Sequence, residues 1–126
     1  MYFKRGESFR FDFKQPLKAT LGLLIEGKLV DVEKTQYECE IIDISPNGVK
    51  VFTKADFGEH NNKQLQFELH FKLDEAQIHA VGDIIWQRPY IGGKQYGLTF
   101  HQQPKLETLI VTELKARRRK EVLNKQ

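Results

Sequence analysis

Two polar side chains in the middle of the chain have a spacing that suits ligand recognition. They belong to the hexapeptide DISPNG at positions 43–48, which lies between two apolar segments. Asp43 and Ser45 are two residues apart, so both side chains would leave the same face of an extended strand. The Pro-Asn-Gly sequence that follows suits a β-turn, and its glycine, Gly48, has no Cβ to keep a ligand from the backbone. By itself, this pattern predicts a hairpin turn with a carboxylate and a hydroxyl on one face.

A second group of candidate ligand-binding residues is basic and lies near the N-terminus. Arg5 and Arg10 flank a Gly-Glu-Ser-Phe stretch, and Lys4 precedes them. Gly, Glu and Ser do not favour a strand there, so we expect a loop. A guanidinium group carries fork-shaped donors that suit phosphate oxygens and the O6 and N7 edge of guanine, and it can stack on a base. If the fold brings this loop near Asp43, cations for phosphate and an acceptor for guanine N–H groups would share one site.

Other chemistry has little support in the sequence. There is no nucleophile elbow, zinc-protease motif or phosphate-binding P-loop, so we expect a protein that is not an enzyme. The single cysteine, Cys39, lies within a strand pattern and has no neighbouring base. The four histidines, His60, His70, His79 and His101, stand singly, and we expect neither a metal site nor a cofactor.

Length and composition describe one globular domain over residues 1–126. With 40% hydrophobic and 29% charged residues, the chain can form one core and is too short for two ordinary domains. One cysteine excludes an internal disulfide, and no apolar run approaches the roughly 20 residues that span a bilayer. Without a signal sequence, these features predict a cytoplasmic protein that does not insert into a membrane. The net charge of +3 leaves room for a small anionic ligand.

Strands are the main elements expected to hold these residues. Apolar residues and their alternation predict strands at positions 17–25, 29–32, 37–44, 49–53, 64–73, 76–87 and 95–100. A loop over 1–13, which leads into a short extended segment, would end with a break at Gln15-Pro16, and a hairpin connection is expected over 89–94. In the 76–87 strand, the alternation places Trp86 in the core, and Gly82 is a candidate bulge.

One helix is expected after the strands. Leu106, Leu109, Ile110 and Leu114 recur at spacings of three and four within 104–123, which gives one apolar stripe. The basic run at 117–120 at its far end would complement the negative helix terminus. Short strands joined by hairpins predict an all-β fold, a six- or seven-stranded antiparallel β-barrel over 17–100 followed by this C-terminal α-helix.

The order of these motifs resembles the PilZ domain, a bacterial receptor module for cyclic di-GMP. The marks of that family are an N-terminal R-x-x-x-R loop and a later D/N-x-S-x-x-G strand end. The hexapeptide at 43–48 fits the second mark in full, whereas Arg5 and Arg10 have four residues between them in place of three. The segments VGDIIW at 81–86 and YGLTF at 96–100 resemble later strands of the family, so the resemblance covers nearly the whole chain.

The resemblance implies a non-catalytic receptor for cyclic di-GMP. The implied ligand-binding residues are Arg5, Arg10, Asp43, Ser45 and Gly48, with Lys4 and Asn47 beside them. The arginines would hold phosphates and guanine edges, Asp43 would hydrogen-bond a guanine, and Ser45 would support it. The N-terminal segment would close over the ligand and change the surface that a downstream protein partner meets.

Two other functions remain open from the sequence. A PilZ-like barrel that no longer binds the dinucleotide would act as a protein-interaction adaptor and would not need Arg5 or Arg10. A single-stranded nucleic-acid binder would depend instead on the basic run at 117–120. The small net charge argues against nucleic acid as the partner.

Overall fold

The computed structural model describes residues 10–25, 28–29, 36–57, 65–101 and 103–124. Among these residues the elements are β1 (Phe11–Ile25), β2 (Lys28–Leu29), β3 (Tyr37–Ser45), β4 (Gly48–Thr53), β5 (Leu65–Lys72), β6 (Gln77–Tyr90), β7 (Gly93–Phe100) and α1 (Pro104–Asn124).

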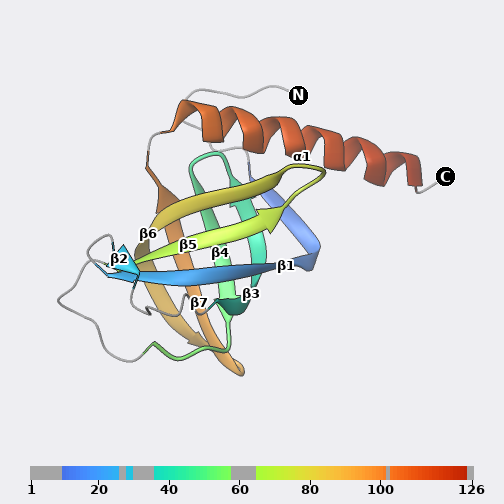
Figure 1. Cartoon of the computed structure of the whole chain (residues 1–126). Helices are drawn as coiled ribbons and strands as arrows, with labels where there is room; N and C mark the ends of the chain where they lie inside the picture. The colour runs from blue at the N-terminus through green and yellow to red at the C-terminus, as the bar shows by residue number, and fades with distance from the viewer. Residues whose placement is uncertain (1–9, 26–27, 30–35, 58–64, 102, 125–126) are drawn as a thin grey trace.

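Six of these strands close into an antiparallel barrel (Figure 1). They follow the order β1-β3-β4-β7-β6-β5, and β5 pairs back with β1 through registers such as Leu21 with Leu69 and Leu23 with Phe67. The two-residue β2 pairs with the end of β1. Of the strand expected at 29–32, only Leu29 lies within the described residues, and it belongs to β2. The predicted all-β barrel with one C-terminal helix is confirmed.

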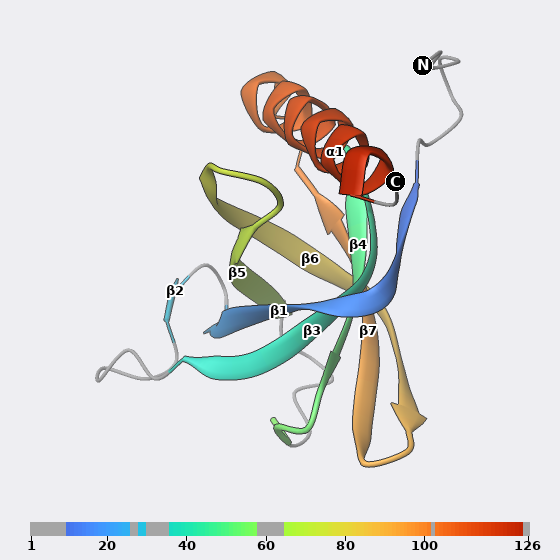
Figure 2. The ribbon, with the colours of Figure 1, turned by 90° about the vertical axis from the view of Figure 1, so that its right-hand side faces the viewer.

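The helix α1 lies across one end of the barrel (Figures 1 and 2). Leu106, Ile110 and Leu114 are buried and belong to the same apolar core as the inward residues of the strands, and Leu109 packs against that core. The predicted apolar stripe is therefore confirmed. Within the described residues there is no helix both long and apolar enough to cross a membrane.

A buried carboxylate fixes α1 to the turn between β5 and β6. Glu113 is 8% exposed, and its Oε1 accepts hydrogen bonds from the backbone N–H groups of residues 74, 75 and 76 at 3.2, 2.9 and 2.8 Å. One helical turn further, Arg117 donates to the carbonyl of Leu73 at 2.9 Å. Unpaired buried N–H groups are costly, so these bonds hold the helix in one position on the barrel.

The start of the barrel differs from the expectation. The predicted break at Gln15-Pro16 is instead part of one continuous strand, β1. The pairing of β1 with β3 shifts register between Asp12 and Leu17, so the irregularity signalled by the proline takes the form of a bulge in the ladder. The segment from Phe11 to Phe13, assigned to a loop with a short extended end, belongs to β1, and Phe11 and Asp12 pair with β3.

The connection between β6 and β7 is shorter than the one predicted over 89–94, because both strands extend into that range. β6 continues to Tyr90 and β7 begins at Gly93, so two residues link them. Gly92 has φ of +81°, a conformation that glycine adopts without strain. Pro89 fits inside β6 because the pairing with β5 ends at Asp83, and beyond that point the missing proline N–H costs no bond to β5.

The expected burial of Trp86 is wrong. The β6–β7 register shifts between Ile84 and Trp86, which inserts Ile85 as an extra residue in β6. An extra residue reverses the inward and outward alternation of those after it. Trp86 is therefore 38% exposed, on the outer face of the barrel. The bulge follows Ile84 and does not lie at Gly82, where it was expected.

Candidate functional site

One row of cross-strand neighbours forms the floor of the candidate site. Asp43 on β3 pairs with Lys50 on β4, Lys50 pairs with Gly97 on β7, and Gly97 pairs with Trp86 on β6. Directly opposed residues of antiparallel strands share one face, so these four positions lie side by side on the outer face. Gly97 has no side chain, and the Trp86 indole occupies that space, since a Cβ on Gly97 would lie 2.0 Å from Trp86 Nε1.

Asp43 is the electrostatic centre of the row. Its side chain is 7% exposed; Arg10 Nη1 donates to its Oδ1, and Lys50 Nζ lies 3.4 Å from its Oδ2. Each carboxylate oxygen thus has its own cation, which compensates for the burial of the charge. The pairing of Phe11 with Ile44 at the start of β1 brings Arg10 to this position.

A pocket of about 310 Å³ opens above the row. Besides the four residues of the row, its lining includes Arg10, Val49, Ile85 and Leu98. Arg88 lies over the Trp86 ring, 5.4 Å from the centroid, and extends the positive charge along β6. Two cations, a buried carboxylate and an aromatic face suit a flat anionic ligand that also carries N–H donors.

The turn beside the pocket uses its own polar groups. Ser45 is buried, and its Oγ donates to the Gly48 carbonyl and accepts from the Asn47 N–H, both at 3.3 Å. A Cβ on Gly48 would lie 2.7 Å from the Leu98 carbonyl oxygen. The space at Gly48, expected to admit a ligand, is therefore filled by the backbone of β7. The carbonyl of Asn47 accepts from the Phe100 N–H at 2.9 Å, which ties the turn to β7.

The structure joins some of the predicted site residues and adds others. Arg10 and Asp43 meet, whereas Lys4 and Arg5 lie outside the described residues. Lys50 and Trp86 were missed. The sequence did carry a signal for Lys50, because a two-residue turn over Pro46 and Asn47 places Lys50 opposite Asp43. No comparable signal was available for Trp86, whose position depends on the bulge.

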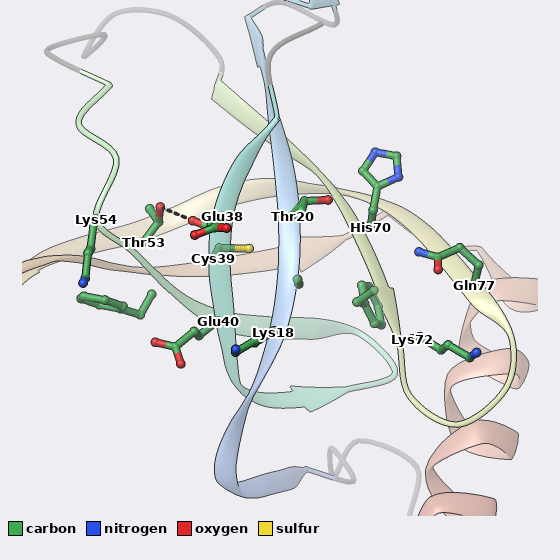
Figure 3. A pocket seen from close by; sticks show the side chains of 13 residues that line it. Lys18, Thr20, Glu38, Cys39, Glu40, Thr53, Lys54, His70, Lys72 and Gln77 are labelled. Carbon is green, nitrogen blue, oxygen red and sulfur yellow. Dashed lines mark hydrogen bonds between the residues drawn. The ribbon is translucent and has the colours of Figure 1, made fainter.

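A larger hollow of about 590 Å³ lies elsewhere, around the point where β1 and β5 separate, and none of the described motif residues lines it (Figure 3). Cys39 contributes to its wall. Burial raises the pKa of this thiol from its ordinary 9.0 to about 12, with a smaller contribution from Glu40, so the thiolate nucleophile is scarce. Thr53 Oγ1 donates to the Glu38 carbonyl at 2.9 Å. This hydroxyl is therefore hydrogen-bonded to the backbone of β3.

The histidines that are described make local contacts. His70 and His79 face each other across β5 and β6 with ring centroids 4.3 Å apart, and His70 Nε2 lies 2.9 Å from Glu68 Oε1. Within the described part of the chain there is no group of three or more potential metal ligands. His60 lies outside that part.

The basic run at 117–120 makes intramolecular contacts. Arg117 lies over the Phe13 ring at 5.1 Å, and Arg118 lies over the Phe11 ring at 5.3 Å. Lys120 Nζ is 2.8 Å from an oxygen of Asp74, and the hydrogen bond to this carboxylate is the main reason that the lysine pKa is raised. Because α1 continues to Asn124, the run does not occupy the last helical turn as expected.

The fold and the outer pocket together define a class of protein, a small closed barrel covered at one end by a helix and carrying its candidate site on the outside of the sheet. The family model described as the PilZ domain matches residues 4–115. The chain belongs to the PilZ domain family.

Solved structures with the same fold include two of YcgR from Escherichia coli. Its PilZ domain with c-di-GMP has a TM-score of 0.62 and 13% identity, over 94% of this chain and 98% of that one. YcgR in complex with c-di-GMP gives a TM-score of 0.62 and 15% identity, over 98% of this chain and 51% of that one.

A third similar structure is the Bacillus subtilis inhibitor of motility, MotI/DgrA, with a TM-score of 0.58 and 17% identity, over 98% of this chain and 54% of that one. This chain thus spans about half the length of the YcgR complex chain and of MotI/DgrA. Curated protein sequences gave no match.

Proposed function

We propose that this chain is a non-catalytic receptor for cyclic di-GMP that acts on a downstream protein partner. The observation that supports this most is the meeting of Arg10 with Asp43 in a pocket that also contains Lys50 and Trp86. The cations suit the two phosphates, and the carboxylate is an acceptor for the N–H groups of a guanine edge. The indole face suits stacking against a base. Because the chain has a single cysteine, we further propose that the protein is cytoplasmic.

The two cations around Asp43 give binding a simple physical route. Arg10 is 47% exposed in its side chain, whereas Lys50 is 29% exposed and projects from within β4. When Arg10 turns toward a phosphate, Lys50 still compensates the buried carboxylate. The ligand therefore recruits one guanidinium without leaving an unpaired buried charge. Such an unpaired charge would cost on the order of several kcal/mol. Arg5 and Lys4 would add cations from the N-terminal segment.

Titration calorimetry with cyclic di-GMP tests the proposal. Wild-type protein should release or absorb heat with saturation, and Arg10→Ala should weaken the affinity by about tenfold or more, because a charge-assisted bond contributes about 1.5 to 3 kcal/mol. The matched control is Arg119→Ala, an exposed arginine of α1 away from the pocket. A folded wild-type protein that gives no heat up to about 100 μM ligand would contradict the receptor function.

A protein-interaction adaptor is the second candidate, and one observation favours it. The β6–β7 hairpin exposes Ile85, Tyr90 and Ile91 at 62%, 53% and 92%. Exposed apolar groups of this kind suit contact with another protein. An adaptor would depend on these side chains and would be indifferent to Arg10→Ala. Nucleic-acid binding through the run at 117–120 has less support, because Arg117, Arg118 and Lys120 contact the protein itself.

A further inference from the structure

The first residues of β1 have two faces with different neighbours. Phe11 and Phe13 are buried, 4% and 7% exposed, and their rings lie 5.0 Å apart in the core. Asp12 is exposed and pairs with Asp43 in the β1–β3 register, and Arg10 bonds to Asp43 on the same side. Alternation along the strand therefore ties the position of Arg10 to the packing of the two phenylalanines.

The helix α1 contacts the inner face of this short segment. Figure 2 shows the start of β1 rising toward α1. The guanidinium of Arg118 lies 5.3 Å from the centroid of the Phe11 ring, and that of Arg117 lies 5.1 Å from the centroid of the Phe13 ring. Both distances are within the range at which a cation is attracted to an aromatic face.

We propose that Arg118 is a positioning residue for the ligand site, acting through Phe11 to hold Arg10 beside Asp43. The expected effect on the affinity for cyclic di-GMP rests on the proposed function. Its structural basis is the continuous path from Arg118 to Phe11, and from the adjacent Arg10 to Asp43. A strand segment that leaves β3 part of the time lowers the fraction of binding-competent molecules, and the apparent affinity falls by that fraction.

Arg118 is the better test of this path than its neighbour. Arg117 also donates to the Leu73 carbonyl and lies 3.6 Å from Glu121, so its removal would disturb the docking of the helix. Arg118→Ala removes the cation above Phe11, and Arg118→Lys keeps a cation with a different shape. Arg119→Ala is the matched control, since Arg119 is exposed on the next position of the same helix.

The first measurement is amide hydrogen exchange of the full chain, followed in the peptide that covers residues 11–13. Arg118→Ala should speed exchange there by about two- to fivefold, the effect of losing one partly exposed cation–π contact. Arg119→Ala should leave that peptide unchanged, and Arg118→Lys should restore much of the protection. Equal exchange in the two alanine variants, or an equal increase over the whole chain, would overturn the positioning role.

The second measurement is the calorimetric affinity for cyclic di-GMP. Arg118→Ala should weaken it by up to about two- to fivefold, with the larger effect if the segment is already open in much of the population, and bound ligand should in turn slow exchange in residues 11–13, because coupling between two sites is reciprocal. Exchange in residues 11–13 that is the same with and without saturating ligand would overturn the inference. If the wild type binds no cyclic di-GMP, the proposed function fails, and the exchange experiment still decides whether Arg118 holds this segment in place.

Discussion

Asp43→Asn isolates the charge at the centre of the candidate site. The substitution keeps the shape of the side chain and one acceptor oxygen but removes the negative charge that Arg10 and Lys50 surround. A bond between a guanine N–H and a carboxylate is worth about 1.5 to 3 kcal/mol, and the same bond to a neutral amide about 0.5 to 1.5 kcal/mol. The difference of about 1 to 2 kcal/mol corresponds to an affinity for cyclic di-GMP that is about five- to thirtyfold weaker.

The control for this variant is Asp12→Asn. Asp12 is exposed and pairs with Asp43 across β1 and β3, so both substitutions remove one negative charge from nearly the same place. Loss of a nearby negative charge favours an anionic ligand through long-range attraction, and the control measures that contribution alone. Calorimetry at two salt concentrations then separates the hydrogen bond to Asp43 from the long-range electrostatic attraction, since salt screens only the latter strongly. Equal affinities for the two variants would refute the role assigned to the Asp43 carboxylate.

Four further predictions concern the support of the site and the core. Glu113→Ala should lower the free energy of unfolding by roughly 2 to 4 kcal/mol in urea denaturation, because three backbone N–H groups lose their acceptor, and Thr108→Ala, on the exposed face of α1, should have little effect. Gly97→Ala should displace the Trp86 ring, which a Cβ would approach to 2.0 Å, and shift its emission maximum without unfolding the protein. Cys39 should react with a thiol reagent at pH 8 about a thousandfold more slowly in the folded than in the urea-unfolded protein, since its pKa is about 12 in place of 9.0. Because of the same raised pKa, the unfolded state loses the thiol proton at lower pH than the folded state, so the free energy of unfolding should fall between about pH 9 and 12. The fall should be smaller in Cys39→Ala. An equal dependence of the free energy of unfolding on pH in the wild type and in Cys39→Ala would contradict this.

Much of the fold follows from local patterns in the sequence. The alternation over 64–73 and the spacing of Leu106, Ile110 and Leu114 each reflect one buried face, and β5 and α1 bury those faces as predicted. The turn at 46–47 also follows from its residues, because proline and asparagine suit those positions whatever surrounds them. Arg10 and Asp43 were expected to meet through family resemblance, and the pairing of β1 with β3 brings them together.

The remaining features depend on pairings between distant strands. Trp86 continued the apolar alternation of its strand, and only the register against β7 shows that Ile85 is an extra residue that turns the indole outward. The row that joins Lys50 to Trp86 crosses Gly97, which lies 47 residues after Lys50 in the sequence. The run at 117–120 had the composition of a solvated surface, and its contacts with Phe11 and Phe13 arise from where α1 crosses the barrel end.

Trp86 is the single tryptophan of the chain and lines the candidate pocket, so its fluorescence reports on that pocket alone. The most direct test is therefore a titration of wild-type protein with cyclic di-GMP, followed by Trp86 emission and compared with Arg10→Ala. We expect a saturable change in emission, with the midpoint at about tenfold or more higher ligand concentration in the variant. An emission unchanged up to about 100 μM, or the same midpoint in both proteins, would contradict a cyclic di-GMP site built on Arg10, Asp43, Lys50 and Trp86.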